Sequence, residues 1–357
     1  MLQEQSEHIN MNETNVKKYD TLLASIQQQL GFHPFIVPRS FQNPYFQTFS
    51  PFLLPYFKCG LLRVTKKFIT IPDGTRLIAD CVFQENYKHH STIVVLDGII
   101  GSSNSRFSLG MGNKAFYFGF NVILLNHRGQ GDSMSLTSSL FDSGLEGDLG
   151  YALGEINEWG FKNIYLVGLS HGGYLALREM GIQGKTAKKT INGLVVISPP
   201  IDPNEYLENI NKRSLFSKLF IREANKLIEK RAQLDPPGSW ELSKLKSIKT
   251  IRQWDEIVLH TLGNFTTLEE YLAEANVLPL IPNIAIPTLA IHSYDDLLVS
   301  ARQFEKQEIQ NNPYIITMLT KYGGHGGFIT LRKNNKDLDM HWAQNRALEF
   351  FRLLYKE

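Results

Sequence analysis

Short runs of consecutive apolar residues recur along the chain between residues 92 and 319. Each run is about five residues long, is rich in β-branched side chains and does not alternate with polar residues. Strands buried on both faces of a parallel sheet show this pattern, whereas a strand with one solvated face alternates. The runs are TIVVL (92–96), NVILL (121–125), NIYLV (163–167), GLVVI (193–197), PTLAI (287–291) and IITML (315–319). They predict the central strands of one sheet.

The segments around these runs predict helices and one hairpin. Residues 144–159 and 172–182 are able to form helices between strands. Upstream, RVTKKFITI (63–71) and TRLIADCVF (75–83) flank a turn at Pro72-Asp73-Gly74, which indicates an antiparallel hairpin. Strands that alternate with helices are typical of an α/β protein. We therefore expect a mostly parallel central sheet with helices on both faces.

One long stretch, residues 201–284, interrupts this alternation because it contains no strand-like run. Its apolar residues recur at helical spacing, and a structureless loop of this length would be unusual. The sequence therefore predicts a helical cap inserted into the sheet. Within it, NKRSLFSKLFIREANKLIEKR mixes basic and acidic residues. This mixture favours a lid with one solvated face over a helix lying on a membrane surface.

The first 58 residues differ from the rest of the chain. Residues 1–13 are polar and are expected to fray, whereas residues 14–30 space apolar side chains as a helix does. Residues 31–58 are rich in aromatics and prolines, which favours an extended arm over a regular helix. The predicted parts are therefore a helix and arm (1–58), a first core segment (59–200), the cap (201–284) and a second core segment (285–357).

Composition limits the cellular compartment and the classes of binding partner that we expect for this protein. The 37 basic and 35 acidic residues give a net charge of +2, so no overall field attracts nucleic acid. No run of about 18 apolar residues predicts a transmembrane segment, and the N-terminus lacks the pattern of a signal peptide. Only Cys59 and Cys81 are present, and both are expected to be free thiols. We expect a soluble, cytoplasmic protein; peripheral membrane contact and oligomeric state stay open.

A candidate nucleophile lies in the sequence VGLSHGGY (167–174). Gly168-Leu169-Ser170-His171-Gly172 matches G-x-S-x-G, follows a predicted buried strand directly and opens a predicted helix. In a nucleophile elbow, small flanking residues let strand and helix approach closely and present the serine hydroxyl at the carboxyl edge of the sheet. A glycine-rich turn without chemistry is the alternative, so the partners of Ser170 decide between them.

The base and the acid are expected later in the chain, because elbow enzymes carry their partners in the order serine, acid, histidine. Among the ten histidines, His325 follows the last apolar run and lies between glycine pairs in GGHGG. His341 falls in a predicted closing helix, where packing is favoured. The acid should follow the penultimate run, where Asp295 and Asp296 are adjacent. The spacing to Leu297-Leu298-Val299 favours Asp296, with Asp295 as a solvated or capping neighbour.

The expected oxyanion donors are the backbone amides of His171 and Ile99, the latter in the loop DGIIGSSNSR (97–106). The His171 imidazole is expected to pack beside the elbow. The loop NHRGQGDS (126–133) lacks the spacing of a phosphate-binding motif, so we interpret it as a rim loop with Arg128 and Asp132 in structural contacts. No cysteine and histidine spacing indicates a metal site, and no cofactor is expected.

Taken together, these motifs resemble the α/β-hydrolase superfamily, and more narrowly its YheT-like branch, which is related to the ABHD group of esterases and lipases. The resemblance is carried by NPYFQTF, DGIIGSSNS, NHRGQGDS, GLSHGG, IRQWDEIVLHTLGNFTTLEEYLAEAN, YDDLLV and GGHGGF, which span residues 43–328. It implies a triad of Ser170, His325 and Asp296 that cleaves carboxylic esters through an acyl-enzyme. The family usually has His-Gly where this chain has Asp97-Gly98.

The sequence therefore predicts a serine hydrolase that acts on a small-molecule or lipid-like ester. Two alternatives stay open at this point. The first is a catalytically silent member of the fold that acts as a binding protein, for which Asp97 in the oxyanion loop is the supporting feature. The second keeps the triad but changes the substrate to a thioester, a lactone or an amide, because specificity depends on the pocket and not on the fold.

Overall fold

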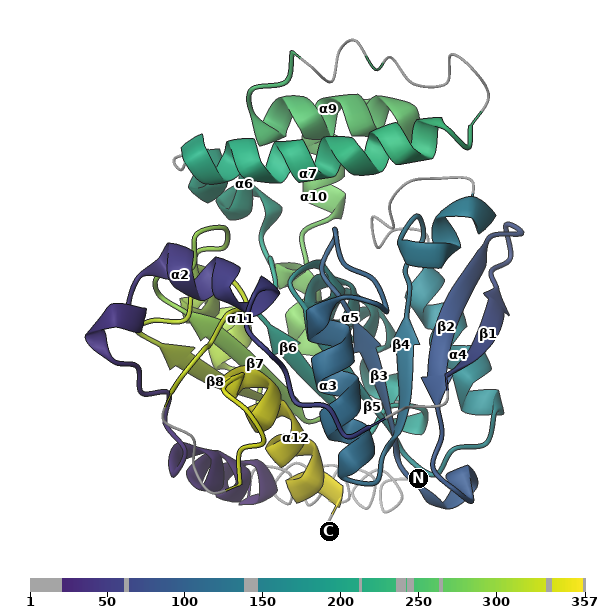
Figure 1. Cartoon of the computed structure of the whole chain (residues 1–357), viewed down its shortest axis with the longest axis vertical. Helices are drawn as coiled ribbons and strands as arrows, with labels where there is room; N and C mark the ends of the chain where they lie inside the picture. The colour runs from purple at the N-terminus through teal and green to yellow at the C-terminus, as the bar shows by residue number, and fades with distance from the viewer. Residues whose placement is uncertain are drawn as a thin grey trace, which may run out of the picture.

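The computed structural model describes residues 21–60, 64–137, 147–211, 214–235, 242, 247–262, 266–331 and 336–355. Its centre is an eight-stranded sheet with the strand order β1-β2-β4-β3-β5-β6-β7-β8 (Figure 1). The strands from β3 to β8 are parallel to one another, and β2 runs antiparallel to both β1 and β4. The strands are β1 (Thr65–Thr70), β2 (Arg76–Val82), β3 (Thr92–Leu96), β4 (Asn121–Leu125), β5 (Ile164–Leu169), β6 (Gly193–Ile197), β7 (Thr288–Ser293) and β8 (Ile315–Thr320).

Every apolar run used for the prediction coincides with one of the strands β3 to β8 to within one residue at its start. The side chains of β3 are almost fully buried and alternate between two separate cores. Val94 belongs to one core, whereas Val95 belongs to the other. This two-sided burial explains why the runs are continuously apolar. The mostly parallel sheet of an α/β-hydrolase is thus confirmed.

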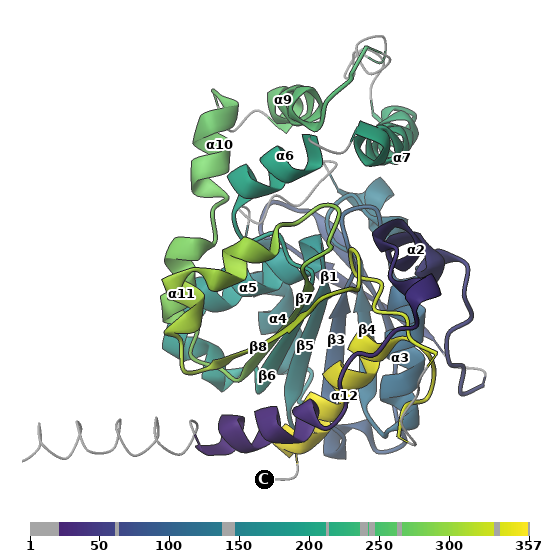
Figure 2. The same cartoon turned by 90° about the vertical axis from the view of Figure 1, so that its left-hand side faces the viewer.

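Helices cover both faces of the sheet (Figure 2). Residues 21–31, α3 and α12 contribute to the core that contains Val95, whereas α4, α5, η5 and η6 contribute to the core that contains Val94. The bounds are α3 (Arg106–Tyr117), α4 (Asp148–Glu158), α5 (His171–Gln183), α11 (Gln307–Gln310), α12 (Trp342–Tyr355), η3 (Tyr87–His89), η4 (Gly131–Leu136), η5 (Gly184–Lys189), η6 (Leu278–Asn283) and η7 (Ala301–Glu305). Residues 1–20 and 138–146, which include parts of two predicted helices, lie outside the described residues.

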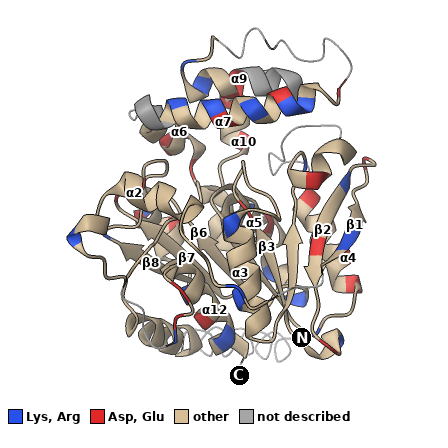
Figure 3. Ribbon diagram, in the orientation of Figure 1, with Lys and Arg blue, Asp and Glu red and all other residues tan. Residues whose placement is uncertain are grey.

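In the described part of the segment between β6 and β7, four helices stand above the carboxyl edge of the sheet (Figure 1). They are α6 (Pro203–Asn211), α7 (Ser214–Ala232), α9 (Ile251–Leu262) and α10 (Leu268–Glu274). The amide of Val277 donates a 3.0 Å hydrogen bond to the carbonyl of Ile201, so the two ends of this insertion meet. Figure 3 shows basic and acidic residues side by side on α7. None of the described helices combines the length and apolar character needed to span a bilayer.

The N-terminal arm differs from the expectation in one respect. Within residues 31–58 the structure has an α-helix, α2 (Pro44–Phe49), flanked by the 3₁₀ turns η1 (Arg39–Phe41) and η2 (Ser50–Phe52). The side chain of Asn43 caps α2 by accepting hydrogen bonds from the amides of Tyr45 and Phe46, and Pro44 occupies the first helical position. Proline is favoured there because that position needs no amide donor. The expectation of a wholly extended arm was therefore wrong.

Candidate active site

Ser170 lies in the sharp turn between β5 and α5. Its backbone has φ of 51° and ψ of −118°, a conformation that few residues other than glycine adopt. A Cβ on Gly172 would lie 2.5 Å from the carbonyl oxygen of Asp97, and one on Gly168 would lie 2.5 Å from the backbone of Gly172 and Gly173. The strand and the helix can therefore approach only because these positions are glycine. The turn presents the serine at the carboxyl edge of the sheet.

The structure brings Ser170, His325 and Asp296 together, although 155 positions separate Ser170 from His325. The Oγ of Ser170 lies 2.8 Å from Nε2 of His325. On the other side of the ring, Nδ1 lies 3.0 and 3.1 Å from the two carboxylate oxygens of Asp296. A neutral imidazole in this position keeps its proton on Nδ1, where the carboxylate accepts it, and leaves Nε2 free to accept the hydroxyl proton.

The carboxylate of Asp296 is buried but well satisfied. Its Oδ1 accepts hydrogen bonds from the amides of Leu298 and Val299 at 2.7 and 2.9 Å. Burial alone would raise the pKa of Asp296, but the neighbouring His325 and His292 and the amide of Val299 hold the pKa below its usual value. The acid is therefore ionised at neutral pH and faces the imidazole as an anion.

The loop of His325 is held in place by contacts with three other parts of the chain. Asp295 accepts a 2.8 Å hydrogen bond from the amide of Gly324, and the Ser293 hydroxyl donates to the carbonyl of Gly324 at 2.9 Å. The amide of Gly326 donates to the Ser198 hydroxyl at 3.1 Å. From the arm, Thr48 accepts a 2.9 Å hydrogen bond from the amide of His325 itself. Asp295 thus lies against the histidine loop instead of facing solvent alone.

The loop after β3 lies directly beside the serine. A Cβ on Gly98 would be 3.6 Å from the Cβ of Ser170. Asp97 organises the start of this loop: Oδ1 accepts a 2.7 Å hydrogen bond from the amide of Gly98, and Oδ2 accepts from the hydroxyls of Ser105 and Ser108. Burial raises the pKa of Asp97 to about 6, although the hydrogen bonds from Ser108 and Gly98 oppose this shift. Both carboxylate oxygens of Asp97 therefore accept hydrogen bonds from residues that follow it in the chain.

Gln130 is a further residue of this site, and sequence reasoning missed it. Its Nε2 donates hydrogen bonds to the carbonyls of Gly98 and Ile99 at 3.0 and 3.1 Å. The carbonyl of Gly98 and the amide N–H of Ile99 belong to one planar trans peptide and point in opposite directions. Because the buried Gln130 side chain binds the carbonyl side of this peptide, the N–H of Ile99 points away from Gln130. Its position in the loop NHRGQGDS was the available signal, but that loop had been assigned only structural contacts.

Arg128 and Asp132, the two rim-loop residues expected in structural contacts, have such contacts. Arg128 forms hydrogen bonds of 2.6 and 2.8 Å with the buried carboxylate of Asp148 and one of 2.8 Å with Asp73. Asp132 forms an ion pair with Lys66 on β1.

The His171 ring stacks on Tyr174 with ring centroids 5.5 Å apart, so its imidazole packs beside the elbow. In the described part of the chain, no three metal-binding side chains gather.

The amide of His171 lies at the start of α5, directly after Ser170. It is the first residue of α5, and the first amides of a helix lack an acceptor within the helix. The N–H groups of His171 and Ile99 thus come from the two segments that flank Ser170. This strained serine, its hydrogen-bonded histidine and the parallel sheet define the class of protein as an α/β-hydrolase.

Comparison with known proteins identifies the family. The family model described as serine aminopeptidase, S33, matches residues 87–311, which is more than half of the chain. The chain belongs to this family of α/β-hydrolases. It is 27% identical to the putative esterase YheT of Escherichia coli over 83% of this chain and 87% of that protein. It is 24% identical to phospholipase ABHD3 of Bos taurus over 75% of this chain and 67% of that protein. These similarities support the YheT and ABHD branch.

A solved structure is similar in fold. An esterase of Pyrococcus furiosus, PF2001, aligns with a TM-score of 0.51 and 18% sequence identity. The alignment covers 76% of this chain and 88% of that chain. The family and these relatives support a hydrolase.

Proposed function

We propose that this protein cleaves carboxylic esters with Ser170 as nucleophile, His325 as base and Asp296 as the orienting acid. One observation carries the proposal: Nε2 of His325 lies 2.8 Å from the hydroxyl of Ser170, while Nδ1 lies 3.0 Å from the ionised Asp296. A serine hydroxyl is a weak nucleophile unless a base takes its proton, and the base needs an acid to fix its tautomer. Both requirements are met by hydrogen bonds.

The reaction follows from this geometry in two halves. Ser170 attacks the ester carbonyl as His325 takes its proton, and the resulting imidazolium donates that proton to the leaving alcohol. This leaves an acyl group on the Oγ of Ser170. A water molecule then attacks the acyl carbonyl while His325 again acts as base, and the acid is released. Throughout, the buried carboxylate of Asp296 stabilises the imidazolium.

The negative charge on the carbonyl oxygen needs donors that are already in place. We assign this role to the backbone amides of Ile99 and His171. Gln130 supports the first amide by binding the opposite side of its peptide, and Asp97 supports it by binding the amide of Gly98. In this proposal Asp97 replaces the histidine usual in the family and shapes the loop, because its oxygens are occupied by loop donors and do not face the oxyanion.

We further propose that the insertion at 201–284 acts as a cap that forms much of the acyl pocket. Its apolar side chains pack against both sides of the site: Trp254 and Ile228 belong to a cluster that includes Ile99, and Leu272 belongs to one that includes Leu298. An apolar cap above a serine nucleophile suits a lipid-like ester. The relatives named as a phospholipase and a monoacylglycerol lipase are consistent with this class of substrate.

A silent binding protein would need no hydrogen bond between serine and histidine and no strained backbone at the serine. Such strain costs on the order of 1–3 kcal/mol and persists at sites where it serves a function. The positive φ of Ser170 therefore argues for chemistry. Thioesters, lactones and amides could use the same three residues, so a substrate panel has to separate them from oxygen esters.

The test combines covalent labelling with hydrolysis. A fluorophosphonate should label the unmodified protein, because this reagent requires an activated serine, and p-nitrophenyl esters of increasing acyl length should be hydrolysed. Ser170→Ala should lose labelling and reduce kcat by about four to six orders of magnitude. Ser135→Ala, which changes an exposed serine, is the matched control and should retain both. Full hydrolysis by Ser170→Ala would refute the assignment, and a lack of labelling in the unmodified protein would favour the silent binding protein.

A further inference from the structure

The N-terminal arm exposes an unusual amount of apolar surface. Of the 18 large hydrophobic side chains exposed in the described part of the chain, six lie between residues 32 and 53. Two of them are adjacent at the end of η2, where Phe52 is 66% exposed and the following Leu53 is 81% exposed. Tyr45 and Phe46 on the preceding helix α2 are exposed as well. Such clustering marks an interaction site, because single exposed apolar residues are normally scattered.

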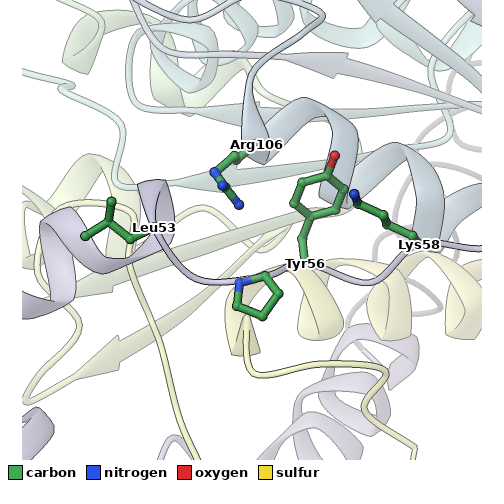
Figure 4. Close-up of a pocket in the computed structure, with 5 residues that line it drawn as sticks. Leu53, Tyr56, Lys58 and Arg106 are labelled. Carbon is green, nitrogen blue, oxygen red and sulfur yellow. The ribbon is translucent and has the colours of Figure 1, made fainter.

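Two cations accompany this apolar surface. Leu53 lines a pocket of about 440 Å³ together with Pro55, Tyr56, Lys58 and Arg106. Figure 4 shows the guanidinium of Arg106 between Leu53 and Tyr56, with the ammonium of Lys58 beside the ring of Tyr56. Arg106 donates one hydrogen bond, of 3.0 Å, to the carbonyl of Leu54. Lys58 lies 5.4 Å from the centre of the Tyr56 ring.

The charged side chains of the arm itself have one sign, and the neighbouring Asp339, which accepts a 2.8 Å hydrogen bond from the amide of Phe57, is paired with the buried Lys114. No Asp or Glu occurs among residues 21–60, and none lines the pocket. The cap differs, because on α7 Arg222 and Lys226 both form ion pairs with Glu223. Unlike α7, the arm therefore combines exposed apolar side chains with cations that lack a neighbouring carboxylate in the pocket. Amphipathic surfaces of this kind bind the interface of anionic lipid bilayers.

We propose that Phe52, Leu53, Lys58 and Arg106, the arm patch, dock the protein on an anionic phospholipid bilayer. Phe52 and Leu53 insert among the acyl chains. The guanidinium of Arg106 binds a lipid phosphate in the pocket, since its planar donors suit phosphate oxygens, and Lys58 adds a second cation. No covalent step is involved, so the inference stands apart from the proposed hydrolysis.

The location of the arm patch links it to the candidate active site. Two positions before Ser50 and the start of η2, Thr48 accepts the hydrogen bond from the amide of His325. Phe49 packs against the apolar cluster that joins the cap to Leu297 and Leu298. The patch therefore continues from the segment that contacts both the histidine loop and the cap. A bilayer held there would lie beside the candidate active site and would itself be the source of a lipid-like ester.

Vesicle flotation with the full-length Ser170→Ala protein tests the docking without hydrolysis of the vesicles. The probes are vesicles of phosphatidylcholine alone and of phosphatidylcholine mixed with phosphatidylserine. Binding to the mixed vesicles should be stronger and should fall with added salt. Lys58→Gln combined with Arg106→Gln should weaken it roughly twenty- to thirtyfold, since each cation near an anionic surface contributes about fivefold. Phe52→Ser combined with Leu53→Ser should weaken binding to the mixed vesicles by at least about tenfold.

Matched variants control for general effects on charge and apolar surface. Lys88→Gln with Lys185→Gln removes two exposed lysines outside the arm, and Tyr151→Ser with Ile182→Ser removes two exposed apolar side chains on α4 and α5. Both should bind the mixed vesicles as the parent does. Because Arg106 also contacts Leu54, Lys58→Gln alone serves as a milder variant and should lose about fivefold.

Three results would overturn the proposal. One is a failure of the parent protein to float with the mixed vesicles. Another is undiminished binding by the arm-patch variants, which would assign docking to a different surface. The third is a concentration-dependent dimer in analytical ultracentrifugation that Phe52→Ser with Leu53→Ser abolishes, because the patch would then be covered by a second copy of the chain. Flotation of the Ser170→Ala protein together with an absence of esterase activity in the unmodified protein would leave the docking supported and refute only the proposed hydrolysis.

Discussion

The amide of His325 donates a 2.9 Å hydrogen bond to the hydroxyl of Thr48, which lies 277 positions earlier in the chain. Thr48 in turn donates to the carbonyl of Pro44 at 2.7 Å, so the bond connects the histidine loop to the first turn of α2. The neighbouring Gln47 strengthens the connection, because its side chain binds the amide and the carbonyl of Ile329 at 2.8 and 3.0 Å. The arm is therefore part of the support of the candidate base.

Thr48→Val should test this support, because valine keeps the shape of the side chain and removes the acceptor. The amide of His325 then loses its partner, the histidine loop shifts, and kcat for a short p-nitrophenyl ester should fall about tenfold with little change in KM. Thr48→Ser retains the hydroxyl and should retain activity. An unchanged kcat in a folded Thr48→Val protein would show that the arm does not position His325.

Gln130→Ala should impair the oxyanion loop without changing the nucleophile. It removes the two hydrogen bonds to the carbonyls of Gly98 and Ile99, so the peptide that carries the N–H of Ile99 is free to rotate. We expect kcat to fall by roughly one to two orders of magnitude at nearly constant KM, because the lost interaction acts mainly in the transition state. Steady-state kinetics with a series of esters checks this. A rise in KM alone would instead indicate a role in substrate binding.

The raised pKa of Asp97 predicts a pH dependence of stability. Its pKa is about 6 in the folded protein against an ordinary value of 3.8, so the folded state binds this proton more tightly than the unfolded state does. The contribution of Asp97 to the free energy of unfolding is thus greatest below the unfolded pKa and falls as pH rises through the window from 3.8 to about 6. The loss is at most about 3 kcal/mol.

Denaturant unfolding of the unmodified protein and of Asp97→Asn checks this sign. Asparagine does not titrate, so the stability of the unmodified protein relative to the variant should decline between about pH 4 and pH 7. Taking the difference removes the opposite contributions of Asp296 and Asp339, whose pKa values are lowered. A difference that rises with pH over this window would contradict the burial of an ionisable Asp97.

Gly172→Ala and Gly154→Ala should have opposite effects on stability, although both glycines lie in helices. A Cβ at position 172 would lie 2.5 Å from the carbonyl oxygen of Asp97, so the elbow must distort and both stability and labelling by a fluorophosphonate should be lost. A Cβ at position 154, on the exposed side of α4, would meet nothing within 4 Å. There, alanine should stabilise the protein by about 0.5–1 kcal/mol. Thermal unfolding of both variants would show whether the elbow needs its glycine.

The sheet could be predicted from the sequence because its strands are buried on both faces. The run at 121–125, for example, became β4 with the same bounds. The hairpin was also predictable, since Asp73 and Gly74 form a turn that suits two pairing strands. In the arm, Asn43 and Pro44 were the visible signal for the start of α2. The prediction gave more weight to the general preference of prolines for extended chain and therefore missed this helix.

The three candidate catalytic residues could be predicted from their order in the chain, whereas the residues that hold them in position could not. Ser170, Asp296 and His325 each follow a strand, so the topology of the sheet is enough to expect them at one edge. Thr48 and Gln130 act through hydrogen bonds to segments 277 and 32 positions away. Neither contact leaves a local pattern in the sequence, because a threonine or a glutamine at such a position is equally compatible with solvent.

The hydrogen bond between Val277 and Ile201 has a consequence for how this protein could change over time. Because both ends of the insertion meet at one point after β6, the chain between Ile201 and Val277 leaves the core and returns to it at the same place. Under the proposed function, replacing the segment between these two residues would exchange the acyl pocket as a module, while Ser170, Asp296 and His325 remain on the sheet below.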